Sequence, residues 1–337
     1  MHQYVERAQH TVITEQLFGD RIVNFLYSRG REKAPSLFRL ATSARVSSLL
    51  GFVNFDLPLA DKILGNRRFL ERHGVDLQEC LDPPASFTCA RKIFERKIRY
   101  PQCRPMAEDD GAVVSPADAR MLCGTMADGD CFSLKGKFFE YRELLGDHRR
   151  KWQKAFGRGE CAIFRLTPDK YHYNHVPVNG RVVEFYEISG DYHSCNPGAV
   201  VEMVTPYSKN KRVVTIIDTD VPEGTRIGLV AMVEVVALMI GDVVQCYSES
   251  GGYDFPRQIQ AGMFLRKGQP KSLFRPGSST DILLFQTGRV VFAEDLVSLM
   301  QRPDVASRFS IGFGGPLAEV DVRVRSLIGR RRVPKVR

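Results

Sequence analysis

From about residue 111 to the end of the chain, short β-branched and apolar runs alternate with Gly, Pro and Asn/Asp turns. Examples are GAVVSPADARML, GRVVEFYEI, RVVTIIDTDV, IGLVAMVEVV and TDILLF. Many short strands separated by turn signals are typical of a β-sandwich or barrel-like core. The pattern therefore predicts a mainly antiparallel β-rich core, which we place at residues 106–337.

The earlier part of the chain has a helical pattern. In SLFRLATSARVSSLLGFV (36–53), leucines and alanines recur near helical spacing, and Pro35 precedes them as the start of a helix allows. We predict a helical N-terminal region over 1–105 that forms a layer on the β-rich core, in one structural domain of the α+β class. The 36–53 helix packs either on this core or flat on a membrane surface.

The charge balance favours an anionic partner. The 337 residues carry a formal net charge of +9, and the sequence ends in the basic stretch RVRSLIGRRRVPKVR. Nucleic acid and acidic lipid both suit such a charge. No nucleic-acid-binding motif occurs and no aromatic residues alternate with the basic run, so we expect no nucleic-acid partner.

Two further patterns bear on location. The longest apolar stretch, 227–241, is shorter than the roughly 20 residues that a membrane span needs, and Glu234 lies at its middle. We expect a buried strand pair or core segment there. The first ten residues lack the apolar region of a secretory signal, and the eight cysteines are scattered without a CxxC pair. We therefore expect reduced thiols, no metal site and a cytoplasmic location.

Three separated stretches combine turn residues with reactive side chains. SPADAR contains Asp118, DKYHYNHVPVNG contains His172 and His175, and FRPGSST contains Ser278 and Ser279. Taken singly, they fit a backbone cap, a surface pair or metal half-site, and a hairpin turn. Together they supply the carboxylate, imidazole and hydroxyl of a catalytic triad. Most chains of this length contain these residue types, so the pattern by itself leaves both interpretations open.

The order of the motifs resembles that of the phosphatidylserine decarboxylase family, whose members are self-processing pyruvoyl enzymes. SPADAR resembles the family's PADG motif, and FRLTPDKYHYNHVPVNGRV is similar to its "FRL.P.DYHR.H.PV.G" signature. Five more stretches occur in the family's order along most of the chain: FERKIRYPQCRPM, LKGKFFEYRELLG, GDYHSCNP, KNKRVV and RKGQPKSLFRPGSST.

The resemblance assigns roles to the reactive residues. It makes Asp118 the carboxylate that orients His175, and His175 the general base. A serine of the Gly-Ser-Ser turn attacks the preceding backbone carbonyl, and an N-to-O acyl shift followed by β-elimination cuts the chain. The cut at 278/279 gives a large β chain and a small α chain, and Ser279 becomes a covalent pyruvoyl group that serves as the electron sink.

Two assignments stay open within the resemblance. Ser279 fits the family's spacing to both Phe274 and Phe285, whereas Ser278 fits only the upstream spacing and is the alternative pyruvoyl precursor. His172 matches the family's other histidine, and it either protonates or positions substrate or makes a structural hydrogen bond.

Several departures put the lipid substrate in question. Ala119 replaces a usual glycine, GQPKS (268–272) replaces "GEEMG", and AMVEVVALMIG replaces a Gly-rich stretch and brings Glu234 toward the pocket region. The self-cleavage residues are retained.

The resemblance implies conversion of phosphatidylserine to phosphatidylethanolamine by a homodimer of cleaved protomers, bound peripherally to the cytoplasmic face of a membrane. Three alternatives remain. They are a pyruvoyl decarboxylase of a soluble amino acid, with aromatic amino acids among the candidates, a non-processing lipid- or protein-binding relative, and a serine hydrolase. The absence of a GxSxG elbow disfavours the hydrolase.

Overall fold

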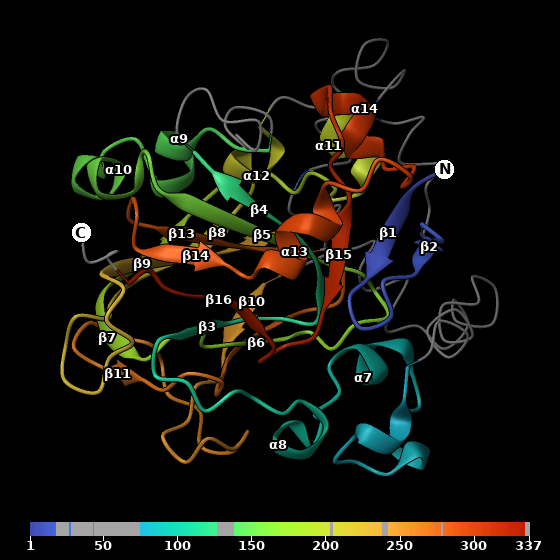
Figure 1. Ribbon diagram of the computed structural model, residues 1–337. Coiled ribbons are helices and arrows are strands. Elements are labelled where there is room, and N and C mark those ends of the chain that lie inside the picture. The colour runs from blue at the N-terminus through green and yellow to red at the C-terminus, as the bar shows by residue number, and fades with distance from the viewer. Residues whose placement is uncertain are drawn as a thin grey trace.

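The computed structural model describes residues 1–17, 27, 43, 75–126, 138–202, 205–237, 242–277 and 279–333. A ten-stranded sheet crosses the molecule in the order β11-β7-β8-β9-β13-β5-β4-β15-β1-β2 (Figure 1). Neighbouring strands are antiparallel except β1 and β15, which are parallel. The strands are β1 (Gln3–Glu6), β2 (Val12–Thr14), β4 (Ala119–Thr125), β5 (Glu160–Leu166), β7 (Gly180–Ile188), β8 (Arg212–Asp218), β9 (Leu229–Val236), β11 (Phe264–Leu265), β13 (Ser279–Phe285) and β15 (Glu319–Val322).

Two three-stranded sheets accompany the large one, with the orders β10-β12-β6 and β14-β16-β3. Their strands are β3 (Ala112–Val114), β6 (Tyr173–His175), β10 (Val243–Gln245), β12 (Pro270–Phe274), β14 (Val290–Phe292) and β16 (Leu327–Arg331). Side chains of β6 and β12 form hydrogen bonds with Glu234 on β9, so this small sheet packs on one face of the large sheet.

Short helices surround the sheets. In Figure 1, α7 and α8 lie at one end of the molecule, whereas α9 to α12 lie at the other. The helices are α7 (Ala90–Phe94), α8 (Tyr100–Cys103), α9 (Tyr141–Leu145), α10 (Arg150–Phe156), α11 (Pro197–Glu202), α12 (Pro206–Lys209), α13 (Glu294–Met300) and α14 (Arg308–Phe313), with 3-10 turns at Leu77–Glu79 and Pro84–Ser86.

The hydrophobic core has two parts. The larger part extends along the ten-stranded sheet and includes every apolar residue of the central strand β13. A smaller cluster joins α7 to the sheet of β6 and β12 through Phe94, Tyr171 and Leu273. Residues around the predicted histidines thus belong to a packed structure, which holds them in place.

The α+β class and the antiparallel β-rich core are confirmed, and the segment 229–236 is the buried strand β9. The helical region predicted over 1–105 differs from the structure at its start, because β1 and β2 are strands of the large sheet. These strands are too short to show a local pattern, and pairing of β1 with the distant β15 stabilises them. The predicted 36–53 helix lies outside the described residues, apart from Ser43. No helix of the described ranges is long and apolar enough to cross a bilayer.

Candidate active site

Ser279 begins β13, at the centre of the large sheet. It is opposite Leu166 on β5 and Val236 on β9, and it is fully buried. Its Oγ has no hydrogen-bond partner within the described part of the chain. Gly277 precedes it with φ of 149°, a conformation that L side chains rarely adopt, so this turn requires a glycine. Ser278 lies outside the described residues.

His175 is held in one tautomer. Its Nδ1 donates to the carbonyl oxygen of Gly268 at 2.9 Å, which leaves Nε2 to accept from the Tyr171 hydroxyl at 3.0 Å. The ring is fully buried, and burial lowers the pKa of His175 to about 3. The imidazole is therefore neutral, and the Tyr171 hydroxyl occupies its Nε2 lone pair.

Asp118 forms an ion pair with Arg104. The Nε of Arg104 lies 3.0 Å from Oδ1 and its Nη2 lies 2.8 Å from Oδ2, while the Val324 amide donates to Oδ1 at 2.7 Å. Burial alone would raise the pKa of Asp118, but the Arg104 charge and hydrogen bonds hold it below its usual value. Asp118 is therefore a carboxylate.

The structure differs from the predicted pairing of Asp118 with His175. No hydrogen bond joins the two side chains among the residues that the structure describes, and Gly268 orients the ring instead. Asp118 acts on His175 only through its charge, which raises the pKa of the imidazole slightly against the effect of burial. The guanidinium group of Arg104 donates two parallel hydrogen bonds to a carboxylate, whereas an imidazole N–H donates one. This explains why Asp118 pairs with Arg104 and not with His175.

His172 stacks on the Phe94 ring, with the ring centroids 3.5 Å apart and an interplanar angle of 25°. Neither ring nitrogen has a well-formed hydrogen bond within the described ranges, although the Lys170 carbonyl acts on the ring. Burial lowers the pKa of His172 to about 3, so this histidine is also neutral. The Phe274 amide donates to the His172 carbonyl at 3.1 Å, which ties His172 to the strand that precedes the Ser279 turn.

Sequence reasoning missed Arg104, Tyr171 and Gly268 as partners of the predicted residues. Arg104 lies in FERKIRYPQCRPM and Tyr171 in DKYHYNHVPVNG, both stretches that carry the family resemblance. Their positions could have drawn attention to them, but the sequence gives no sign of which carboxylate or imidazole each one contacts.

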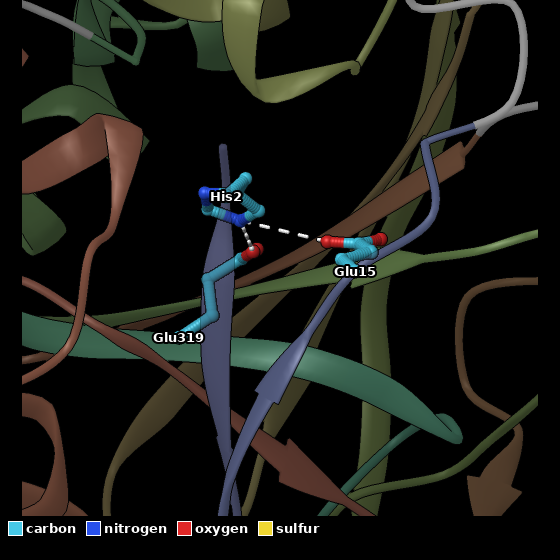
Figure 2. A group of neighbouring side chains, drawn as sticks. All are labelled: His2, Glu15 and Glu319. Atoms are coloured by element: carbon cyan, nitrogen blue, oxygen red, sulfur yellow. Dashed lines mark hydrogen bonds and ion pairs between the residues drawn. The ribbon is translucent and has the colours of Figure 1, made fainter.

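One group has the composition of a metal site. His2 Nε2 lies 2.8 Å from Glu319 Oε2 and 3.5 Å from Glu15 Oε2, as Figure 2 shows. Arg165 already binds both carboxylates, with Nη1 3.0 Å from Glu15 Oε1 and Nε 2.9 Å from Glu319 Oε1. A metal ion would have to compete with this guanidinium, so the group fits a structural network that ties the N-terminus to β5 and β15.

Comparison with known proteins identifies the family of this chain. A sequence model described as phosphatidylserine decarboxylase matches residues 90–310, which include the motifs of Asp118, His172, His175 and Ser279. The chain belongs to the phosphatidylserine decarboxylase family.

Relatives in this family are similar over most of their length. A phosphatidylserine decarboxylase proenzyme of Chlamydia pneumoniae is 30% identical over 88% of this chain and 90% of its own. One from Ruminiclostridium cellulolyticum is 29% identical over 88% of this chain and 91% of its own. One from Chlamydia trachomatis is 33% identical over 68% of this chain and 70% of its own.

Membership in the phosphatidylserine decarboxylase family confirms two predictions, the family itself and the enzyme class, a carboxy-lyase. The name proenzyme, which these relatives carry, agrees with the predicted self-processing. The roles of the individual residues stay predictions.

Proposed function

We propose that this chain cuts itself before Ser279 and that the pyruvoyl group formed there decarboxylates phosphatidylserine to phosphatidylethanolamine. The observation that carries the proposal is the Ser279 hydroxyl, which is fully buried and has no hydrogen-bond partner in the described residues. A buried polar group without a partner is costly and is uncommon in folded proteins unless it has a function.

The surroundings of Ser279 fit self-cleavage. The hydroxyl oxygen forms a bond to the carbonyl carbon of residue 278, the peptide bond to Ser279 breaks, and a neutral base takes the hydroxyl proton. His175 is the base that the resemblance predicts, and its buried ring is neutral as this role requires. Its Nε2 lone pair accepts from the Tyr171 hydroxyl, so Nε2 can take another proton only if this hydrogen bond is broken or relays the proton.

The chain's own residues account for the rest of the site. A pyruvoyl group supplies a carbonyl that holds an amine substrate and accepts the electron pair released with CO2. His172 is neutral and stacked on Phe94, which suits a residue that positions substrate. Both histidines and Ser279 are fully buried, so bulk water does not compete with their interactions.

The lipid surface is also a proposal. The formal net charge of +9 supports binding to an anionic membrane, at its cytoplasmic face. The free amino-acid substrate is the alternative. Two experiments separate the lipid substrate from the free amino acid. The first is flotation with vesicles of phosphatidylserine and with neutral vesicles. The second is an assay of decarboxylation on phosphatidylserine, free serine and aromatic amino acids. Turnover of a free amino acid without flotation would favour the soluble substrate.

The self-cleavage is tested by denaturing intact mass of the purified protein. We expect two fragments, 1–278 and 279–337, the smaller one lighter than its sequence by the change from serine to pyruvoyl and blocked at its N-terminus. A small fragment that starts at residue 278 would show that the pyruvoyl group forms at Ser278. The variant S279A should remain a single chain, and an uncut wild-type chain would contradict the proposal.

A further inference from the structure

A cluster of polar and charged side chains lies between the large sheet and the small sheet of β6 and β12. It consists of Glu234 on β9, Asp281 on β13, Lys271 and Ser272 on β12, and Asn174 on β6, and all five residues are fully buried. Glu234, Lys271 and Ser272 belong to the two stretches, GQPKS and AMVEVVALMIG, in which the sequence departs from the family pattern. The structure thus brings these separate departures together.

Glu234 is the anion of this cluster. Its Oε2 accepts from Lys271 Nζ at 2.6 Å, and its Oε1 accepts from Asn174 Nδ2 at 3.2 Å and from the Ser272 hydroxyl. A carboxyl group that accepts every one of its hydrogen bonds, one of them from an ammonium, is ionised. Lys271 is therefore committed to Glu234, and its remaining contact is with Gln245 Oε1 at 3.3 Å.

A bulge in β12 brings two consecutive side chains into this cluster. Lys271 and Ser272 are consecutive, yet both side chains reach Glu234. In a regular strand, consecutive side chains point to opposite faces. The pairing of β12 with β6 shifts register between Pro270 and Ser272, and such a bulge re-aims a side chain toward its neighbour's face.

Asp281 is the neutral acid of the cluster. It is directly opposite Glu234 in the ladder between β9 and β13, and neither of its carboxyl oxygens has a partner within the described ranges. Two ionised carboxylates opposite each other in a buried ladder would repel strongly. Burial first, and then the charge of Glu234, raise the pKa of Asp281 well above its usual value, while Lys271 acts in the opposite direction. Among the described residues, Cys246 also acts on Glu234 and Lys271, and burial raises its pKa to about 12, so it is an uncharged thiol.

Asp281 and Ser279 lie on the same face of β13. They are alternate residues of one strand, so their Cα atoms are about 6.6 Å apart and both side chains point toward β12. Each has a buried polar group without a partner in the described part of the chain. One bridging water molecule would satisfy both groups across such a gap.

We propose that Asp281 donates the proton that the amide nitrogen of Ser279 must receive when the chain is cut there. This inference rests on the proposed self-cleavage. As the Ser279 oxygen forms its bond to the carbonyl carbon of residue 278, the bond from that carbon to nitrogen breaks. The hydroxyl proton goes to the histidine base, and the nitrogen leaves as an amine with the proton of Asp281. The charge of Lys271 acts on Asp281 as well as on Glu234 and so favours the transient carboxylate, and the proton held by the histidine then returns to Asp281 through water.

The first test is the variant D281N in the full chain, made by cell-free synthesis so that cleavage is followed from the start. Samples are quenched at intervals, and the cut fraction is measured by intact mass. Asparagine is neutral and of the same size as the protonated acid, but it has no acidic proton. A positioned proton donor typically contributes about 100-fold or more to a rate, so cleavage of D281N should slow by that factor. Cleavage at the wild-type rate would overturn the proposal.

The matched variant is E234Q, in which Asp281 is free to ionise against Lys271. Cleavage of E234Q should be slow at neutral pH and recover at acidic pH, when Asp281 regains its proton, whereas D281N should not recover. Wild-type cleavage should be constant from neutral to mildly acidic pH and should decline at alkaline pH. A purely structural role predicts the same pH profile for all three chains, and that result would also overturn the proposal. If circular dichroism shows that D281N does not fold, the pH profiles of cleavage of wild type and E234Q test the role of Asp281 by themselves.

These outcomes are distinct from a failure of the proposed function. An uncut wild-type chain would refute the self-cleavage itself, and a cut S279A chain would refute its proposed position at Ser279. A wild-type chain that is cut, an S279A chain that is not, and a D281N chain cut as fast as wild type would refute only the role of Asp281.

Discussion

Arg104 and Asp118 show what a residue's type does and does not say about its contacts. The motif SPADAR singled out Asp118 as a candidate functional carboxylate, and the structure places it in the interior. Its partner could not be read from the sequence, because Arg104 and Val324 approach it only after folding. The family resemblance suggested His175 as the partner, but the hydrogen bonds to Arg104 satisfy the carboxylate.

This ion pair leads to a prediction about stability. In the uncut S279A chain, R104M should lower the free energy of unfolding by about 3 kcal/mol, because it leaves the buried Asp118 carboxylate without its cation. The double variant R104M/D118L should recover most of the loss. Urea unfolding measures both. A double variant as unstable as R104M would show that packing, and not the unpaired charge, dominates.

The contribution of the Arg104–Asp118 ion pair to the free energy of unfolding depends on pH. The pKa of Asp118 is lower in the folded chain than its usual value near 3.8, so the pair's contribution is fully present above that value and is lost as pH falls below it. The difference in stability between S279A and S279A/R104M should therefore shrink at low pH. If the difference in stability between S279A and S279A/R104M is constant from neutral to strongly acidic pH, Asp118 is not the ionised partner of Arg104.

Elements were predicted best where the chain repeats a strong local pattern. The apolar and β-branched runs of β8, β9 and β13 are inner strands whose residues are largely buried, so propensity and burial favour the same structure. The strands β1 and β2 were missed because their stability comes from pairing with the far end of the chain. The bulge in β12 was also unpredictable, since it depends on where Glu234 lies in another sheet.

The turn before β13 supplies a prediction at the scale of an element. In G277A the added methyl group is incompatible with φ of 149°, and strain of about 1–3 kcal/mol should displace the start of β13. Because Ser279 must be aligned with the preceding carbonyl, we expect cleavage to slow by about 10-fold to 100-fold, as measured by intact mass over time. The matched control is G262A, where φ is 92° and no atom would contact the new methyl group. Equal slowing in both variants would mean that general destabilisation is responsible.

The proposed cut has a consequence for the whole molecule. The small fragment would contain β13, which lies between β9 and β5, and β15, which lies between β4 and β1. All four of these neighbours belong to the large fragment, so each strand of this pair is hydrogen-bonded on both edges to the other chain. Folding therefore has to precede cleavage, because the fragments form one core.

We accordingly expect the cut protein to elute as one species under native conditions and to separate into two fragments only in denaturant. Removing the denaturant should restore the uncut S279A chain far better than the cut wild type, since cutting makes the pairing of β13 an intermolecular step and adds the entropy cost of association. Size-exclusion chromatography and recovery of native circular dichroism measure both effects. Fragments that part under native conditions would contradict the interleaved strand order. Equal refolding of the two proteins would show that the strands of the small fragment find their places without the covalent link.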